Sequence, residues 1–270
     1  MKKYLSIALA LTMMVSLAAC GAKKEEAPAA SSAPAENTAK IYAVEAGSAG
    51  EAAALDAGFE ITSVETQAAA LMEVAAGTSD AAVIDLLMAG AMVGEGTSYP
   101  DLKCTDQKLT EEELYGVGCR KGSDLAAYIN GVFAETYADG TMQEIATTYG
   151  VQEALVEQTA DVIAPPTGGD VAYIQDKGVL VVGITDFAPM DYKDDKGEWI
   201  GFDADMAKIV AEKLGVEIEF IEINWDNKVF ELDGKAIDVV WNGMTLTDAV
   251  LEAMECTNAY CTNAQVVVTK

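Results

Sequence analysis

The sequence predicts an α/β fold with parallel, doubly wound sheets. Strand-like and helix-like segments alternate along most of the chain, in the βαβ order that gives parallel strands covered by helices. A Pro- and Gly-rich stretch at 156–171 divides these segments into two series and is typical of a linker. With 51% apolar residues, the roughly 230 residues that can fold suffice for one large domain or two lobes.

Elements of the first series are predicted from apolar runs and helix caps. The expected strands are 40–46, 81–84 and 114–120. The expected helices begin at the capping-box residues Ser48 and Glu51, cover 66–76 and 86–93, begin again after Ser123, and run from Thr141 to near Gly150. The strand at 81–84 leads directly to Asp85, a polar residue at a strand end.

The second series repeats this pattern after the linker. The expected strands are 179–184, 217–223, 237–241 and 264–270, and the expected helices are 203–214 and about 227–233. Residues 231–242 follow the pattern of 73–85, in which a helix end, a Gly, an Asp and an apolar strand lead to a polar residue. The repeat predicts two similar lobes that present Asp85 and Asn242 to one cleft, although βαβ units commonly share such endings.

The N-terminus has the features of an export signal. Two lysines precede an apolar stretch at 5–19, which ends in Leu-Ala-Ala before Cys20. This resembles a bacterial lipobox, whose Cys is lipid-modified after cleavage; an ordinary signal peptide that contains a cysteine is the alternative. We therefore expect residues 1–19 to be removed, Cys20 to carry a lipid anchor, and 20–40 to be a flexible tether outside the membrane.

The charge balance argues against several classes of function. The chain has 44 Asp and Glu residues against 17 Lys and Arg residues, a net charge of −27, and no histidine. So acidic a surface repels phosphate backbones, which argues against nucleic-acid binding. The absence of His excludes Ser-His-Asp and Cys-His nucleophiles and His-ligated zinc. Beyond the N-terminus, no apolar run is long enough to cross a bilayer.

Four further cysteines, Cys104, Cys119, Cys256 and Cys261, leave the redox state open. Export permits disulfides, and the spacings fit neither CxxC redox pairs nor zinc knuckles. Three pairings are possible. We favour the local pairs 104–119 and 256–261, and four reduced thiols are an equal alternative.

Short strings of residues in two stretches of the chain resemble one protein family. In 175–268 they begin at Lys177 (KGVLVVG), Phe187 (FAPM), Gly201 (GFDAD), Val210 (VAEKLGV) and Trp241 (WNGMT). In 41–150 they begin at Gly47 (GSAGE), Asp80 (DAAVID), Arg120 (RKGSDL) and Asp139 (DGT). The two stretches resemble the first and second halves, respectively, of the extracytoplasmic amino-acid-binding proteins of ABC importers, the bacterial family 3 solute-binding proteins. The resemblance implies a two-lobed, type II periplasmic-binding-protein-like fold with a ligand cleft between the lobes.

The two halves stand in the reverse of the family order, so the chain resembles a circular permutant. The linker at 156–171 would join the usual C-terminus to the usual N-terminus. The implied lobe 2 is 41–117 with a returning strand at 265–270, and the implied lobe 1 is 118–264, containing the linker. Extended segments near 116–118 and 263–265 would form the hinge. We expect the valines of the returning strand to be buried and its amides to be paired.

The resemblance implies a site for an amino acid or a related amine. The expected ligand-binding residues are Ser48, Ala49, Gly50, Asp85, Phe187, Trp225, Asn242, Gly243 and Thr245. The first three would hold the carboxylate at a helix N-terminus, with a plain capped helix as the alternative. Asp85 would hold the ammonium group. Phe187 and Trp225 would be aromatic walls, with core packing as the alternative. Asn242, Gly243 and Thr245 would hydrogen-bond the ligand.

One position departs from the family pattern. Family members carry an Arg shortly after the Thr245 position, and it binds the ligand carboxylate through two hydrogen bonds. This sequence has Val250 there, and its single arginine is Arg120, near the expected hinge. The identity of the ligand therefore stays open.

The expected function is capture of a small polar solute by a lipid-anchored substrate-binding protein that delivers it to an ABC permease. We expect a monomer outside the cytoplasm, without enzymatic activity, cofactor or metal. One alternative is a solute-binding module that is sensory or has lost transport. The other is a periplasmic dehydratase-like enzyme. The carboxylates Asp85, Asp186, Asp191 and Asp226 form no specific pair in the sequence that would favour the enzyme.

Overall fold

The computed structural model describes residues 40–159 and 169–270. They belong to one compact unit, Ala39–Lys270. The predicted signal segment, Cys20 and nearly all of the predicted tether lie outside the described residues, as does the centre of the predicted linker (160–168). Within the described ranges, no helix is long and apolar enough to cross a membrane.

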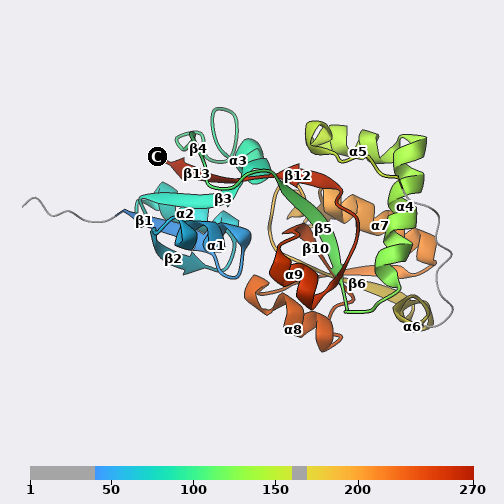
Figure 1. Cartoon of the computed structure of the whole chain (residues 1–270). Helices are drawn as coiled ribbons and strands as arrows, with labels where there is room; N and C mark the ends of the chain where they lie inside the picture. The colour runs from blue at the N-terminus through green and yellow to red at the C-terminus, as the bar shows by residue number, and fades with distance from the viewer. Residues whose placement is uncertain (1–39, 160–168) are drawn as a thin grey trace, which may run out of the picture. The chain divides into compact units, whose positions relative to one another are not determined.

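Five strands form the first sheet, called sheet A here, in the order β2-β1-β3-β13-β4. They are β1 (Ile41–Glu45), β2 (Glu60–Val64), β3 (Ala81–Asp85), β4 (Lys103–Lys108) and β13 (Gln265–Thr269). The first three are parallel, whereas β13 is antiparallel to both of its neighbours. In Figure 1 the red β13, from the end of the chain, lies beside β3, from its first third.

The second sheet, called sheet B, has the order β11-β5-β10-β6-β9, and β12 pairs with β5 beside this path. Its strands are β5 (Glu113–Cys119), β6 (Val179–Ile184), β9 (Glu217–Glu222), β10 (Val239–Thr245), β11 (Glu255–Cys256) and β12 (Cys261–Asn263). β6, β9 and β10 are parallel, and β5 is antiparallel to β10, β11 and β12. A separate short hairpin joins β7 (Tyr192–Lys193) to β8 (Trp199–Ile200).

Helices connect these strands and cover sheet A on both faces. The helices are α1 (Ala49–Asp56), α2 (Gln67–Ala76), α3 (Leu86–Met92), α4 (Leu125–Asp139), α5 (Thr141–Tyr149), η1 (Gln152–Ala154), α6 (Asp170–Lys177), α7 (Phe202–Leu214), η2 (Trp225–Asn227), α8 (Lys228–Asp233) and α9 (Asp248–Ala253). Ala82 and Ile84 of β3 share a core with Leu71 of α2, whereas Val83 shares another with Ala54 of α1. Because successive strand residues point to opposite faces, the two helices lie on opposite sides of this fully buried strand.

The two sheets have the same topology. In each, a βαβαβ run places its strands in the order second, first, third, as β2-β1-β3 and as β9-β6-β10. A strand that follows the other sheet in the chain then takes the fourth place in antiparallel orientation, β13 in sheet A and β5 in sheet B. The predicted parallel order therefore holds for three strands of each sheet, and the antiparallel fourth strand makes each sheet mixed. The sequence repeat at 73–85 and 231–242 leads to the equivalent strands β3 and β10.

Some local predictions need correction. The apolar patterns do not predict β2 and β4, because both are edge strands of sheet A with mostly exposed residues. Helix α6 begins at Asp170, inside the stretch predicted to be linker. Thr141 and Ser123 have the residue types of helix caps, but the N-cap residue of α5 is Gly140, at φ 90°, and that of α4 is Asp124.

The chain crosses between the sheets at two places. One crossing lies at Ala264, between β12 and β13, where the sequence predicts it. The other lies at 109–112, between β4 and β5, so the predicted lobe boundary at 117–118 falls inside a strand of sheet B. The crossings are neighbours, because the Leu109 amide donates to the Gln265 carbonyl at 2.8 Å.

The four cysteines of the described ranges are free thiols. Cys104 lies on β4 of sheet A and Cys119 on β5 of sheet B, so the favoured 104–119 pair does not form. Cys256 and Cys261 also remain unpaired, although both of their strands pair with β5. The alternative of four reduced thiols is the one present in this structure.

Candidate functional site

A small buried cavity lies where the carboxyl ends of β1, β3 and β10 come together. Its volume is about 20 Å³, which is room for about one water molecule. Seven of the nine predicted ligand-binding residues line it, namely Ser48, Ala49, Asp85, Trp225, Asn242, Gly243 and Thr245. Glu45 and Gln67 also line it and were not predicted. Ligands of open α/β sheets bind outside such carboxyl ends, so this cavity is the candidate site.

A larger cavity of about 450 Å³ shares part of its lining with the small one. Both are lined by Ser48, Ala49, Trp225 and Thr245. Val250, which replaces the arginine of the family pattern, lines the larger cavity, as does Lys228. Among the described residues, Lys228 is the only cationic side chain that lines either cavity.

The N-terminus of α1 has two free amides, and one of them belongs to Ala49, which lines the cavity. Ser48 caps the helix, since its Oγ accepts from the Glu51 amide at 3.0 Å, and the Glu51 carboxylate accepts from the Gly47 amide at 2.8 Å. In the part of the chain that the structure describes, the amides of Ala49 and Gly50 have no acceptor. Gly50 itself is buried and does not line the cavity. The helix end is therefore capped and still favourable to an anion.

Asp85 is a buried carboxylate that accepts four hydrogen bonds. The donors are Gln67 Nε2, the Tyr115 hydroxyl at 2.7 Å, Asn263 Nδ2 and Gln265 Nε2 at 3.0 Å. They come from α2, β5, β12 and β13, so this carboxylate joins elements of both sheets. Burial raises the pKa of Asp85 to about 6, although the bonds from Gln67 and Tyr115 favour the charged form.

Glu45, the last residue of β1, is a second buried carboxyl group in the cavity. Only 3% of the residue is exposed, and its Oε1 has no hydrogen-bond partner among the described residues. Burial, helped by the nearby Asp85 carboxylate and opposed by Lys228, raises the pKa of Glu45 to about 8. At neutral pH Glu45 therefore carries a proton, whereas Asp85 is mostly ionised.

Residues after the middle of β10 form the wall that belongs to sheet B. The Asn242 side chain is held by Thr185, accepting from its amide at 2.9 Å and donating to its Oγ1 at 2.7 Å. The Gly243 amide donates to Asp203 Oδ2 at 2.6 Å. These groups already have partners inside the fold. Thr245 is half-buried and lines both cavities, and its Oγ1 donates only a long hydrogen bond, of 3.4 Å, to Glu113 Oε2. Its hydroxyl is therefore the best placed of the three for a ligand.

The two predicted aromatic walls lie in different environments. Trp225 is 6% exposed and lines both cavities. Phe187 does not line the small cavity but lies against Gly243, where an added Cβ would come within 2.4 Å of its ring. It also packs edge-on against Tyr115, with 6.5 Å between the ring centroids. Phe187 therefore supports the wall from behind, which is the core role given above as the alternative.

Lys228, the first residue of α8, lines the larger cavity and links its two walls. Its Nζ donates to the Gly47 carbonyl at 2.9 Å and to the Trp225 carbonyl at 3.1 Å, and lies 4.9 Å from the centre of the Trp225 ring. Gly47 has φ 71°, and an added Cβ there would come within 2.7 Å of the Asp226 backbone. A glycine is therefore required for this close approach.

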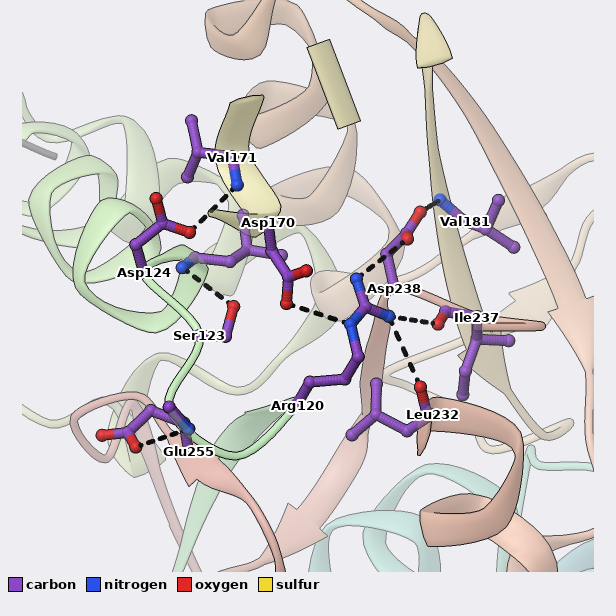
Figure 2. A network of polar contacts seen from close by, with 12 residues as sticks. Arg120, Ser123, Asp124, Asp170, Val171, Val181, Leu232, Ile237, Asp238 and Glu255 are labelled. Carbon is purple, nitrogen blue, oxygen red and sulfur yellow. Dashed lines mark hydrogen bonds and ion pairs between the residues drawn. The ribbon is translucent and has the colours of Figure 1, made fainter. Parts of the chain in front are cut away.

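Arg120 does not take the place of the missing arginine. Figure 2 shows its guanidinium between Asp170 of α6 and the fully buried Asp238, at 3.0 and 3.4 Å. It also donates to the Ile237 carbonyl at 2.9 Å, and Asp238 accepts from the Val181 amide at 2.9 Å. Because its donors are used in this network, Arg120 is a structural residue that ties α6 to sheet B.

The sequence patterns missed three residues of the site, Glu45, Gln67 and Lys228. Glu45 ends β1 as Asp85 ends β3, so the reasoning from polar strand ends could have found it. Gln67 and Lys228 are first residues of helices, and nothing in their neighbourhood marks a side chain that turns into a cavity. Within residues 40–159 and 169–270, no group of three or more His, Cys, Asp or Glu side chains could hold a metal ion.

Comparison with known proteins finds a family match for the last third of the chain. Residues 180–270 match the bacterial extracellular solute-binding proteins, family 3. In this segment, about a third of the chain, the sequence is similar to that family. The resemblance inferred from the short strings in 175–268 is thereby confirmed, and the mixed α/β architecture of the chain agrees with it.

Three similar proteins illustrate the extent of the match. The L-cystine-binding protein TcyA of Bacillus subtilis (strain 168) is 37% identical over 105 residues, which are 38% of this chain and 39% of the relative. Cyclohexadienyl dehydratase of Pseudomonas aeruginosa is 32% identical over 74 residues, 27% of this chain and 28% of the enzyme. A solved ancestral cationic amino acid solute-binding protein is 37% identical, covering 30% of this chain and 36% of that one, with a TM-score of 0.30. The chain thus covers less than half of each.

Proposed function

We propose that this chain is a substrate-binding protein that captures an amino acid or a related amine outside the cytoplasm and delivers it to an ABC permease. The observation that carries the proposal is the small cavity, which is lined by Ala49 with its free helix amide, by two buried carboxyl groups and by Trp225. An amino acid offers the matching groups, an anion for the amide and a cation for the carboxyl groups. The protein acts as a monomer and needs no cofactor.

The match of residues 180–270 to the bacterial extracellular solute-binding proteins, family 3, supports this proposal. TcyA, with its L-cystine-binding function, points in the same direction. With a volume of about 20 Å³, the small cavity must widen to admit an amino acid. We propose that sheets A and B belong to two lobes that separate about the crossings at 109–112 and Ala264, which provides that widening.

A thermal-shift screen tests the proposed function. The full chain is heated with each of the twenty amino acids, L-cystine and simple polyamines. A ligand present at 100 times its dissociation constant stabilises by about 2.7 kcal/mol, which raises the melting temperature of a chain this long by about 5 °C or more. A shift of this size without chemical change of the ligand supports the proposal, and silence across the whole panel contradicts it.

Two alternatives are outcomes of the same screen. The similarity to cyclohexadienyl dehydratase, together with a protonated carboxyl group at Glu45, favours an enzyme as the second candidate. Turnover of a bound compound, followed by chromatography, would establish it. A solute-binding module that senses its ligand without transport would bind but fail to support uptake in cells.

We further propose that Cys20 carries a lipid that anchors the protein at the outer face of the membrane. The apolar segment at 5–19 and the Leu-Ala-Ala-Cys sequence support this. The wild-type protein, expressed in a bacterial host, is expected in the membrane fraction and labelled by palmitate. The Cys20→Ser variant should lose the label and appear in the soluble fraction, and an equal distribution of both proteins would contradict the anchor.

We also propose that the order of segments is a circular permutation of the usual family order. Ala81 of β3 pairs with Tyr42 of β1 on one side and with Thr269 of β13 on the other. The start of β1 and the end of β13 are therefore about two strand spacings apart, or about 10 Å. A short connector could join them, as the unpermuted order requires. The equivalent strand orders of the two sheets also support the proposal, and removal of β13, considered in the Discussion, tests it.

A further inference from the structure

Within the described ranges, Glu45 is the one of the two acidic residues lining the small cavity that has a carboxyl oxygen without a hydrogen-bond partner. It lines the small cavity, is 3% exposed, and its Oε1 has no partner among the described residues. Asp85 lines the same cavity, but its oxygens already accept from four donors. A buried oxygen without a partner is costly unless something in the cavity supplies one.

The charges around Glu45 come from several elements. Asp85 of β3 makes ionisation of Glu45 less favourable, and Lys228 of α8 makes it more favourable. Lys228 in turn faces Asp226 of η2 and Glu51 of α1, and Asp85 faces Glu113 of β5. Lys228 lies beyond ion-pair distance of Glu45, and its Nζ already donates to two carbonyls. Carboxyl groups therefore outnumber cations here, and the position beside Oε1 suits a cationic nitrogen.

We infer that Glu45 is a cation-binding residue of this site, and that it gives up its proton to solvent when a cationic nitrogen of the ligand enters. The neutral Glu45 carboxylic acid becomes a carboxylate paired with the ligand ammonium or guanidinium group, and one proton leaves. Burial keeps Glu45 protonated in the empty cavity, because a lone carboxylate is unfavourable there, whereas a carboxylate paired with a cation is stabilised. Ligand capture is thus coupled to release of a proton. The inference rests on the proposed function, since it names the group that this ligand must carry.

Titration of the ligand-free protein tests the first half of the inference. Carbon NMR of the labelled Glu carboxyl groups should show one resonance that titrates near pH 8 and is absent from Glu45→Gln, whose amide mimics the neutral acid. The folded protein then holds a proton that the unfolded chain loses above about pH 4.5. Because the folded state holds this proton and the unfolded state does not, the unfolding equilibrium constant should increase about tenfold for each unit of pH rise between pH 5 and 7. In Glu45→Gln this contribution to the pH dependence of the unfolding constant should be absent.

The second half is tested by calorimetry with L-arginine and L-cystine, each in two buffers of different ionisation enthalpy. A ligand that binds should release about 0.9 proton at pH 7, and its affinity should rise about fivefold from pH 7 to 8. Because pH 7 to 8 lies above the pKa of Asp85, Asp85 stays mostly ionised over this range and does not contribute to the change. In Glu45→Gln the proton release and the pH dependence should both vanish. Glu60→Gln, an exposed carboxyl group on β2 of the same sheet, should behave as the wild type.

The outcomes separate this inference from the proposed function. Binding without proton release, or an unchanged pH dependence in Glu45→Gln, overturns the inference and leaves the binding protein intact. If neither amino acid binds, methylammonium chloride serves as the probe, and it should shift the Glu45 resonance to lower pH. A Glu45 resonance that titrates near its ordinary value of 4.5, or that ignores methylammonium, overturns the inference whatever the thermal-shift screen shows.

Discussion

A chain that ends at Thr262 is expected to aggregate or to melt far below the full chain, because it lacks β13. This strand lies inside sheet A, between β3 and β4, and pairs with β3 over five residues. Val266, Val267 and Val268 are 1%, 3% and 0% exposed, which confirms the prediction that they are buried. At about 1.5 kcal/mol or more for each valine, the loss is a large share of the roughly 5–15 kcal/mol that stabilises a typical domain.

The experiment compares three chains by circular dichroism melting and by solubility. The control ends at Thr269 and lacks only the exposed Lys270, whose Nζ donates to the Ala75 carbonyl at 3.0 Å. It should melt within a few degrees of the full chain. If the chain that ends at Thr262 also melts with the full chain, then β13 is a dispensable end, and the two-crossing architecture and the permuted order are wrong.

Replacement of Asp85 by Ala is expected to destabilise the ligand-free protein by about 5 kcal/mol. Four buried donors, from Gln67, Tyr115, Asn263 and Gln265, lose their acceptor. At about 2 kcal/mol for each donor, this costs about 8 kcal/mol. Removing the buried charge also removes an unfavourable contribution of about 3 kcal/mol to the free energy of the folded state, since the pKa of Asp85 rises from 3.8 to about 6 on burial. The lost hydrogen bonds therefore dominate.

Urea denaturation at pH 7 measures this change. Asp106→Ala, which removes an exposed carboxylate from β4 of the same sheet, should change the free energy of unfolding by less than about 0.5 kcal/mol. A residue that only contacted the ligand could be replaced with equally little effect. A change below about 1 kcal/mol in Asp85→Ala would therefore assign Asp85 to the ligand alone and contradict its role as a joint between the sheets.

Much of the local structure was predictable because its signals act over a few residues. The Gly77 stop ends α2 in a left-handed conformation, and the Ser48 cap starts α1, both as the sequence indicates. The polar edge strands β2 and β4 were not predictable, because an exposed edge strand needs no apolar pattern of its own. Their existence depends on the neighbouring strand that they pair with.

The site was predictable in position more than in detail. Asp85 and Asn242, singled out as polar strand ends, line the same cavity. The sequence could not show that Asn242 is held by Thr185, or that Phe187 supports Gly243 from behind. It also could not show which of the acidic residues has a free oxygen, because that depends on every neighbour that might donate to it.

By itself the sequence determined the α/β class, most helices and buried strands, and the family resemblance, since periodicity, caps and short strings are properties of neighbouring residues. Only the tertiary structure decided which strands pair across the chain and what state each carboxyl group has. Glu45 and Lys228 lie far apart in the sequence, yet together with Asp85 they set the charge of one cavity. Burial and electrostatic interactions depend on distance in space, which the order of residues does not specify.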